Sequence, residues 1–265
     1  WRSYYASIFN PARLKVGAML SEMPKKYWKN LPEADLIPQL IAGAQAREAA
    51  MVRAGEREER VRPTTLAEVA KGAANCRDCA IADCGTRAVT GEGPQGALLM
   101  IVGEQPGDQE DTTGRVFVGP AGQLLDQHLT RAGIDRSTAY VTNAVKHFKF
   151  TWKGKHRLHQ SPGAKEIDTC RWWLEAERAI IQPRIVLALG ASAARGLLGR
   201  TLSVTCERGR AIALDDGAEL WVTVHPSYLL RLEGEAQAEQ DKVARDIEAR
   251  SGALRSAASS WPRHI

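Results

Sequence analysis

The chain has 265 residues, of which 44% are hydrophobic and 25% charged, and its formal net charge is +5. These values are ordinary for a globular protein with a packed core, and the small positive excess favours an anionic partner without requiring nucleic acid. No stretch reaches the roughly 18 apolar residues of a membrane span, and no secretory leader is present. We therefore expect a soluble, cytoplasmic protein. Because the first residue is Trp1 rather than Met, we interpret the sequence as a fragment or a trimmed chain.

Residues 1–62 have the pattern of a helical N-terminal segment that ends in a linker. The segment is basic and amphipathic, and its last part, RAGEREERVRP (53–63), is dense in charge. Such a run is typical of a solvated helix end or a linker. We therefore place a boundary near residue 62 and predict one domain over 63–265.

A short helix and a group of cysteines begin the predicted domain. In TTLAEVAKGAANC (64–76), Thr64 or Thr65 can cap a helix. An odd number of cysteines argues against a complete disulfide framework and favours metal binding or catalysis. A second C-x-x-C motif, which would indicate a zinc ribbon, is absent, and spacing does not choose between zinc and an iron–sulfur cluster. The cysteines are the C-x-x-C pair Cys76 and Cys79, then Cys84, Cys170 and Cys206.

Strand-like and helix-like patterns alternate from residue 97 onward. Strand runs separated by helices predict a mainly parallel sheet covered on both faces, with the site beyond the carboxyl ends of the strands. The expected strands are 97–104, 139–145, 184–190 and 219–226, and the expected helices are 119–134, 166–182, 191–199 and 236–254.

Two motifs near that edge are acidic or aromatic. GEQPGDQED (103–111) follows the first strand as a tight turn with four carboxylates, Glu104 and Asp108 among them. It is either an acidic turn or a reactive site, and no Lys-Ser/Thr follows that would make it a phosphate loop. Phe117 precedes a Gly-Pro turn, where it is either a core residue or a stacking face.

Three further stretches carry an amide or histidines. Asn143 ends the second strand, and its side chain offers the donor and acceptor needed to read a nucleobase edge, although a turn asparagine fits equally. His225 follows the last strand and is either structural or available for acid–base chemistry. HRLHQSP (156–162) follows the basic KFTWKGK, and its Ser-Pro disfavours a helix. We expect an extended or irregular loop there, whose histidines are either solvated or reactive.

Together, GEQPGDQED, GRVFVGPAGQLLD, YVTNAVKHFKF, HRLHQSP, CRWWLEAE and VTVHPSYLL resemble the uracil-DNA glycosylase superfamily. They resemble its iron–sulfur branch, and within it the UdgX type, over roughly residues 65–250. Residues 1–60 resemble the end of an uncharacterised domain that is fused to such glycosylases. The resemblance implies a three-layer α/β/α fold around a four-stranded parallel sheet.

The resemblance also implies a pocket for a flipped uracil. Phe117 matches the residue that stacks on the base, and Asn143 matches the amide that reads its Watson–Crick edge. His225 matches the histidine that faces the carbonyl oxygen on which charge develops. Asp108 is expected to be catalytic, and Gln105, which agrees with the UdgX pattern, to bind uracil.

A basic loop distinguishes the UdgX type. The resemblance implies that His159 is a nucleophile that attacks the sugar C1′ after uracil leaves and stays bonded to the DNA. Glu104 would orient or deprotonate it, and Lys155 and Arg157 would contact DNA. His156 replaces an arginine. The family pattern Lys-Arg-Arg-Ile-His is matched here by Lys155, His156, Arg157, Leu158 and His159.

A 4Fe–4S cluster is implied by the same branch. Cys76, Cys79 and Cys170 match its ligands. Conventional members have a fourth cysteine after the asparagine-bearing strand, but NAVKHF (143–148) contains none. We expect His147 as the fourth ligand, with Cys84 as the competing one.

Three functions remain open at this point. The first is a single-turnover glycosylase that excises uracil and becomes covalently bound to DNA. The second is a conventional multiple-turnover iron–sulfur uracil-DNA glycosylase, and the third is a noncatalytic iron–sulfur module that binds nucleic acid or a protein. For the leading hypothesis we expect a monomer acting on uracil-containing DNA, preferentially single-stranded.

Overall fold

The structure, a computed structural model, describes residues 29, 61–84, 86–232 and 236–259. The chain divides into two units, residues 1–61 and residues 62–265. Nearly all of the first unit lies outside the described residues, so the helical N-terminal segment stays a prediction. In the described part of the chain, no helix is long and apolar enough to cross a membrane.

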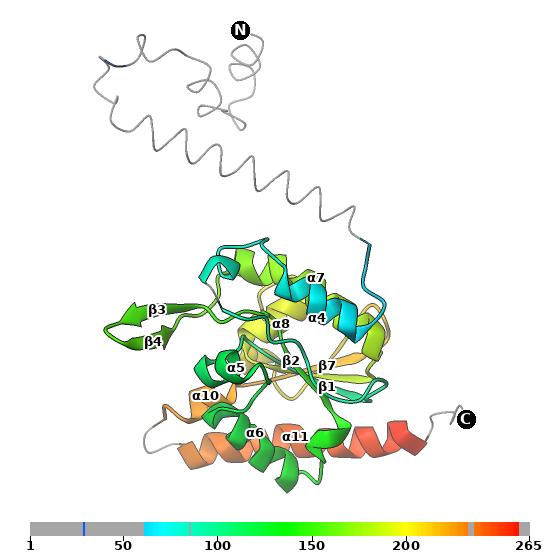
Figure 1. The fold of residues 1–265 in the computed structure, drawn as a ribbon. Coiled ribbons are helices and arrows are strands. Elements are labelled where there is room, and N and C mark those ends of the chain that lie inside the picture. Colours follow the sequence, from blue (N-terminus) through cyan, green and yellow to red (C-terminus); the bar gives the residue numbers. More distant parts are fainter. Residues whose placement is uncertain (1–28, 30–60, 85, 233–235, 260–265) are drawn as a thin grey trace. The chain divides into compact units, whose positions relative to one another are not determined.

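A five-stranded sheet forms the centre of the second unit (Figure 1). Its order is β2-β1-β5-β7-β6, and the first four strands are parallel neighbours. The predicted four-stranded parallel sheet is therefore confirmed. The structure adds β6 as an antiparallel edge strand, which was missed because three residues are too short for a periodic pattern. The bounds are β1 Leu99–Gly103, β2 Tyr140–Asn143, β5 Ile185–Leu189, β6 Ala211–Ala213 and β7 Glu219–Thr223.

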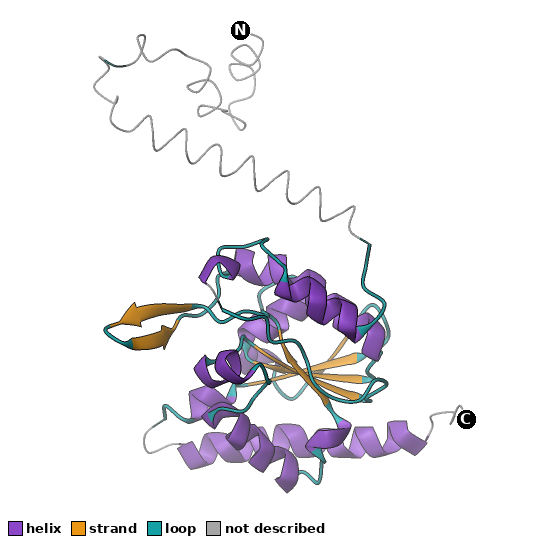
Figure 2. Cartoon of the chain, viewed as in Figure 1, coloured by secondary structure: helices purple, strands orange, loops and turns teal. Residues whose placement is uncertain are grey.

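Helices cover both faces of the sheet, as Figure 2 shows. One layer contains α4 (Leu66–Ala74), α7 (Ala164–Ile181) and α8 (Ala191–Leu198). The other contains α6 (Pro120–Arg131) and α11 (Ala236–Ser259). The remaining helices are the short α5 (Asp108–Thr113), α9 (Val204–Glu207) and α10 (Pro226–Leu229).

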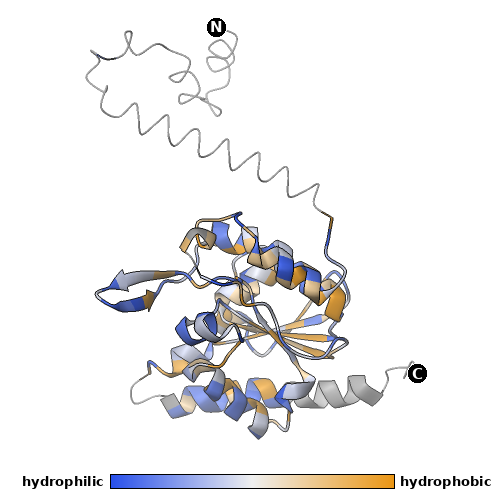
Figure 3. Ribbon diagram, in the orientation of Figure 1, coloured by the Kyte–Doolittle hydropathy of each residue, from blue (hydrophilic) through white to orange (hydrophobic). Residues whose placement is uncertain are grey.

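The alternation of side chains along each strand supplies both layers with a core. Leu99 and Ile101 of β1 belong to the apolar cluster under α6 and α11, whereas Met100 and Val102 belong to the cluster under α7 and α8. Successive residues of a strand point to opposite faces, so a continuous apolar run is what a sheet buried on both sides requires. Figure 3 shows these strands in hydrophobic colours.

The predicted helix cap at the start of the domain is present. Thr65 accepts a hydrogen bond from the Glu68 backbone N–H (3.2 Å), and the Glu68 carboxylate accepts one from the Thr65 N–H (3.2 Å). This reciprocal pair satisfies two of the backbone donors that a helix start leaves unpaired.

Residues 150–159 form a β-hairpin, so the stretch around His156 and His159 is extended, which is one of the two alternatives that we expected. Strands β3 (Phe150–Lys153) and β4 (His156–His159) pair antiparallel, and Figure 1 shows them extending away from the sheet. Gly154 has φ +62° at the first position of the two-residue turn, a conformation that suits glycine and a tight hairpin. The apolar-polar alternation is short and interrupted by basic residues, which is why the sequence pattern did not indicate strands.

Candidate active site

A cavity of about 540 Å³ lies at the carboxyl ends of β1, β2 and β7. Both the sheet and the hairpin contribute to it, so motifs far apart in the sequence meet there. The lining residues include Gln105, Phe117, Asn143, His159 and His225. The cavity therefore lies at the edge of the sheet where the topological rule for parallel sheets predicts a site.

Asn143 presents an unpaired acceptor at this cavity. Its side chain is 2% exposed, and its Oδ1 is buried without a hydrogen-bond partner. A Cβ on Gly103 of the neighbouring strand would clash with this Oδ1 and with the ring of Phe117. A buried acceptor without a donor costs stability, so the site is complementary to a ligand that supplies an N–H group.

Phe117 is held in a backbone conformation that few non-glycine residues adopt. Its φ is +53°, and its buried ring lies 6.1 Å from the ring of His225, with the planes inclined at 29°. The carboxylate of Glu110 supports the turn by accepting hydrogen bonds from the N–H groups of Gly107 (3.0 Å) and Gly119 (2.8 Å). Backbone strain of this kind is often found where a side chain must be presented to a ligand.

His225 is a neutral hydrogen-bond donor in this structure. Its Nδ1 accepts the backbone N–H of Ser227 (3.1 Å) and lies 2.8 Å from the Ser227 hydroxyl oxygen. Burial, and to a smaller extent the nearby charges of His159 and Arg231, lowers the pKa of His225 to about 4. Because Nδ1 is an acceptor, the proton of the neutral ring is on Nε2.

His159 and Glu104 approach each other from the hairpin and the sheet. His159 Nε2 lies 3.6 Å from Glu104 Oε1, and the side chain of His159 is 50% exposed. Ser192 donates its hydroxyl to Glu104 Oε2 (2.6 Å). One carboxylate oxygen is therefore fixed by Ser192, and the other faces the imidazole.

The amide of Gln105 is occupied by the hairpin. Its Nε2 donates to the carbonyl oxygens of Lys149 (3.3 Å) and Gln160 (3.0 Å), and its Oε1 accepts the Lys149 N–H (3.2 Å). These two residues flank the hairpin strands, so Gln105 clamps the hairpin base beside the cavity. Its predicted contact with uracil remains a prediction.

Asp108 and Arg157, predicted as a catalytic and a DNA-binding residue, pair with each other. Arg157 Nε donates to Asp108 Oδ1 (2.6 Å), and its Nη1 donates to Asp111 Oδ2 (2.5 Å). The guanidinium also lies over the rings of Phe148 and Phe150, 5.4 and 5.2 Å from their centroids. These contacts fasten β4 to α5, which no spacing in the sequence indicated.

The three predicted cluster cysteines lie in one apolar region next to α4 and α7. Cys170 belongs to a buried core cluster against which the partly buried Cys76 and Cys79 pack, and the Lys146 N–H donates to Cys170 Sγ (3.3 Å). Burial raises the pKa of the Cys79 thiol and raises that of Cys170 to about 12. Cys84 is exposed.

The fourth ligand is not decided by this geometry. His147 is 4% exposed, and burial, followed by the charge of Arg77, lowers its pKa, so it is a neutral imidazole. Among the residues that the structure describes, no group of three or more His, Cys, Asp or Glu side chains is arranged to hold a metal ion. Three soft thiols in an apolar region, one already accepting a backbone N–H, nevertheless fit the ligation of an iron–sulfur cluster.

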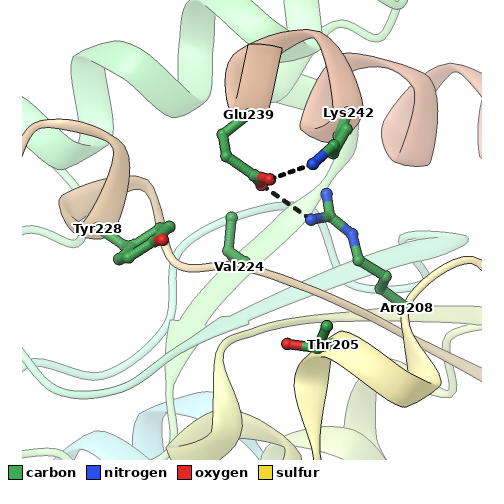
Figure 4. Close-up of a pocket in the computed structure, with 6 residues that line it drawn as sticks. All are labelled: Thr205, Arg208, Val224, Tyr228, Glu239 and Lys242. Atoms are coloured by element: carbon green, nitrogen blue, oxygen red, sulfur yellow. Dashed lines mark hydrogen bonds and ion pairs between the residues drawn. The ribbon is translucent and has the colours of Figure 1, made fainter. Parts of the chain in front are cut away.

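A second cavity, of about 530 Å³, offers less chemistry (Figure 4). Its cations are neutralised, because Arg208 and Lys242 both bind the carboxylate of Glu239, at 3.0 and 2.5 Å. It contains neither an unpaired buried acceptor nor a histidine. Its lining residues are Thr205, Arg208, Val224, Tyr228, Glu239 and Lys242.

A known protein family matches the part of the chain that forms the first cavity. Residues 90–248 match the model of the Uracil DNA glycosylase superfamily, which is more than half of the chain. The chain belongs to that superfamily. Residues 1–33 match a second model, described as a domain of unknown function, DUF4130.

Several relatives are type-4 uracil-DNA glycosylases. That of Thermotoga maritima is 38% identical over 157 residues, which are 59% of this chain and 78% of the relative. That of Pyrobaculum aerophilum is 36% identical over 175 residues, 62% of this chain and 85% of the relative. The predicted superfamily is thus confirmed, while the narrower UdgX type and the origin of the N-terminal segment remain predictions.

Proposed function

We propose that this protein excises uracil from DNA after flipping the nucleotide into the first cavity. The observation that carries the proposal is the buried, unpaired Oδ1 of Asn143. Uracil N3–H is a donor and its neighbouring O4 an acceptor, which matches the two ends of a side-chain amide. The type-4 glycosylases among the relatives support the same activity.

The other groups lining the cavity meet the remaining needs of base excision. Phe117 would stack on the flat face of the base. The Nε2–H of His225 would donate to the uracil carbonyl oxygen, where negative charge develops as the N-glycosidic bond breaks. Because its pKa is about 4, His225 would stay neutral at physiological pH and would stabilise that charge as a hydrogen-bond donor rather than as a cation.

Replacing Asn143 tests this assignment. Asn143→Ala should lower kcat/KM for uracil release from single-stranded DNA about fivefold to 150-fold, because the base edge loses both partners, a loss of roughly 1–3 kcal/mol. Release is measured by cleaving the abasic product with alkali. Asn75→Ala, which removes the same amide from the exposed end of α4, is the matched control and should behave as the wild type. Equal activity of all three proteins would remove the pocket assignment.

After uracil has left, the sugar C1′ can react in two ways. The relatives named type-4 uracil-DNA glycosylases favour the conventional reaction, in which water attacks C1′ and the enzyme turns over. In that reaction Glu104, fixed by Ser192, would orient the water.

Covalent capture is the second candidate, and the position of His159 favours it. The imidazole lines the cavity and faces Glu104 Oε1. Uracil would leave with the electron pair of the C1′–N1 bond, and a lone pair of His159 would form a new C1′–N bond. The ring proton would pass through Glu104 to the uracil anion, so the charges balance. The DNA would then remain bonded to the protein.

We further propose a 4Fe–4S cluster bound by Cys76, Cys79 and Cys170, with His147 as the fourth ligand. When bound, the cluster would cross-link the segment after α4 to α7 through iron–thiolate bonds. The Cys170 thiol, whose pKa is raised by burial, must lose its proton to bind iron, so loading should be favoured at higher pH.

Two single variants decide the fourth ligand. His147→Ala should lower the iron content per chain and weaken the brown colour that an iron–sulfur cluster gives a protein, because the cluster loses a buried donor. Cys84→Ala should keep both, since this thiol is exposed. Iron and sulfide analysis of the purified proteins gives the answer. A full cluster in His147→Ala with a depleted one in Cys84→Ala would exchange the two assignments.

A further inference from the structure

A large aromatic side chain is exposed on the same hairpin that contributes His159 to the cavity. Trp152 is 66% exposed, which is high for a tryptophan. Lys153 and Lys155, both exposed, lie on either side of Gly154 in the turn that follows it. An open aromatic ring with cations beside it is the combination that proteins use to hold single-stranded nucleic acid.

The strand register places Trp152 on the same face of the hairpin as His159. Directly paired residues share a face, and the pairs are Phe150 with His159 and Trp152 with Arg157. Trp152 is therefore one pair further toward the tip, about 7 Å along the strand. A nucleotide bound at His159 would have its neighbour within reach of Trp152.

The ring of Trp152 is also held in place. It meets Phe150 edge-on, with centroids 5.3 Å apart and planes at 88°. Phe150 lies under the guanidinium of Arg157, which is bound to Asp108 and Asp111. Because the hairpin is fastened to α5 in this way, the ring can be presented to a ligand with little loss of conformational freedom.

We propose that Trp152 stacks on a nucleobase adjacent to the flipped uracil in single-stranded DNA, while Lys153 and Lys155 contact its phosphates. In a duplex each base is already covered on both faces by its neighbours, so only an unstacked strand offers the ring a free face. This inference rests on the proposed function, because uracil in the cavity sets the register of the strand.

Binding should be weakened by removal of the ring. Trp152→Ala should raise the Kd for a single-stranded oligonucleotide roughly tenfold to a hundredfold, whereas Trp152→Phe should keep most of the affinity. The oligonucleotide carries one 2′-fluorinated deoxyuridine, whose glycosidic bond resists cleavage, so binding is measured apart from excision. Leu158→Ala, an exposed residue on the opposite hairpin face, is the control and should bind as the wild type.

A second experiment removes the stacking partner of Trp152, the base next to uracil, from the DNA. Two oligonucleotides are compared with the intact one, with a tetrahydrofuran abasic residue placed either 5′ or 3′ of the uracil. The wild type should bind one of these two more weakly, because Trp152 then has no base on which to stack. Trp152→Ala should bind that abasic oligonucleotide and the intact one with equal affinity. An equal loss on intact and abasic oligonucleotides, or no loss at all, overturns the stacking contact. Uracil release by the wild type is assayed separately: its absence would refute the proposed function, while the binding series would still decide the role of Trp152.

Discussion

Lys146→Met should lower the free energy of unfolding by about 3–5 kcal/mol, because it leaves a buried carboxylate without its partner. Lys146 and Glu177 are fully buried, and Lys146 Nζ donates to Glu177 Oε2 (2.7 Å). The same ammonium donates to Thr142 Oγ1 (2.9 Å) and to the carbonyl oxygen of Asn143 (2.7 Å).

Denaturant unfolding measures this effect against a surface pair. Arg115→Met breaks the exposed ion pair with Glu92 and should cost at most about 1 kcal/mol. Adding Glu177→Gln to Lys146→Met should recover part of the loss, since the unpaired charge is removed while an acceptor for the Gly91 N–H remains. If Lys146→Met were no less stable than Arg115→Met, the buried pair would not be a determinant of stability.

Lys146 also connects the first cavity with the cysteine region proposed to bind the cluster. Its side chain holds the backbone carbonyl of Asn143, and its backbone N–H donates to Cys170 Sγ. The residue that would read the base and a cysteine that would bind the cluster are thus joined through one lysine. Partial unfolding of this region should therefore affect uracil release and iron content together.

His159→Ala should abolish any protein–DNA adduct that survives heat and detergent, while uracil release persists. Asn143, Phe117 and His225 would still support departure of the base, and water could then take C1′. The variant should turn over and leave abasic sites. A denaturing gel of protein mixed with uracil-containing single-stranded DNA separates the adduct from the free product.

His156→Ala is the matched control for this prediction. It removes an imidazole from the same strand, but from the opposite face of the hairpin, so the adduct should form as in the wild type. Mass spectrometry of the digested adduct should place the DNA on His159. DNA on His156, or an adduct in His159→Ala, would refute capture by His159. Turnover without any adduct in the wild type would instead establish the conventional hydrolytic fate.

The amino-acid sequence by itself determined the fold class, the superfamily and the region of the site. The apolar run that forms β1 and the helix cap at Thr65 are both local patterns, so each can be predicted without a structure. The order of the strands along the chain then placed Asn143 and His225 at one edge of the sheet. Asn143 was found because it is the last residue of a strand, and His225 because it comes shortly after one.

Only the tertiary structure decided which polar groups are already engaged. It placed the amide of Gln105 on the hairpin backbone, Arg157 between Asp108 and Asp111, and Ser192 on Glu104. The partners in these contacts are 44 to 88 residues apart in the chain, and their pairing depends on how helices and hairpin pack rather than on any local period. A polar side chain has the same sequence signature whether it is free or paired, because burial and the geometry of its neighbours determine which it is.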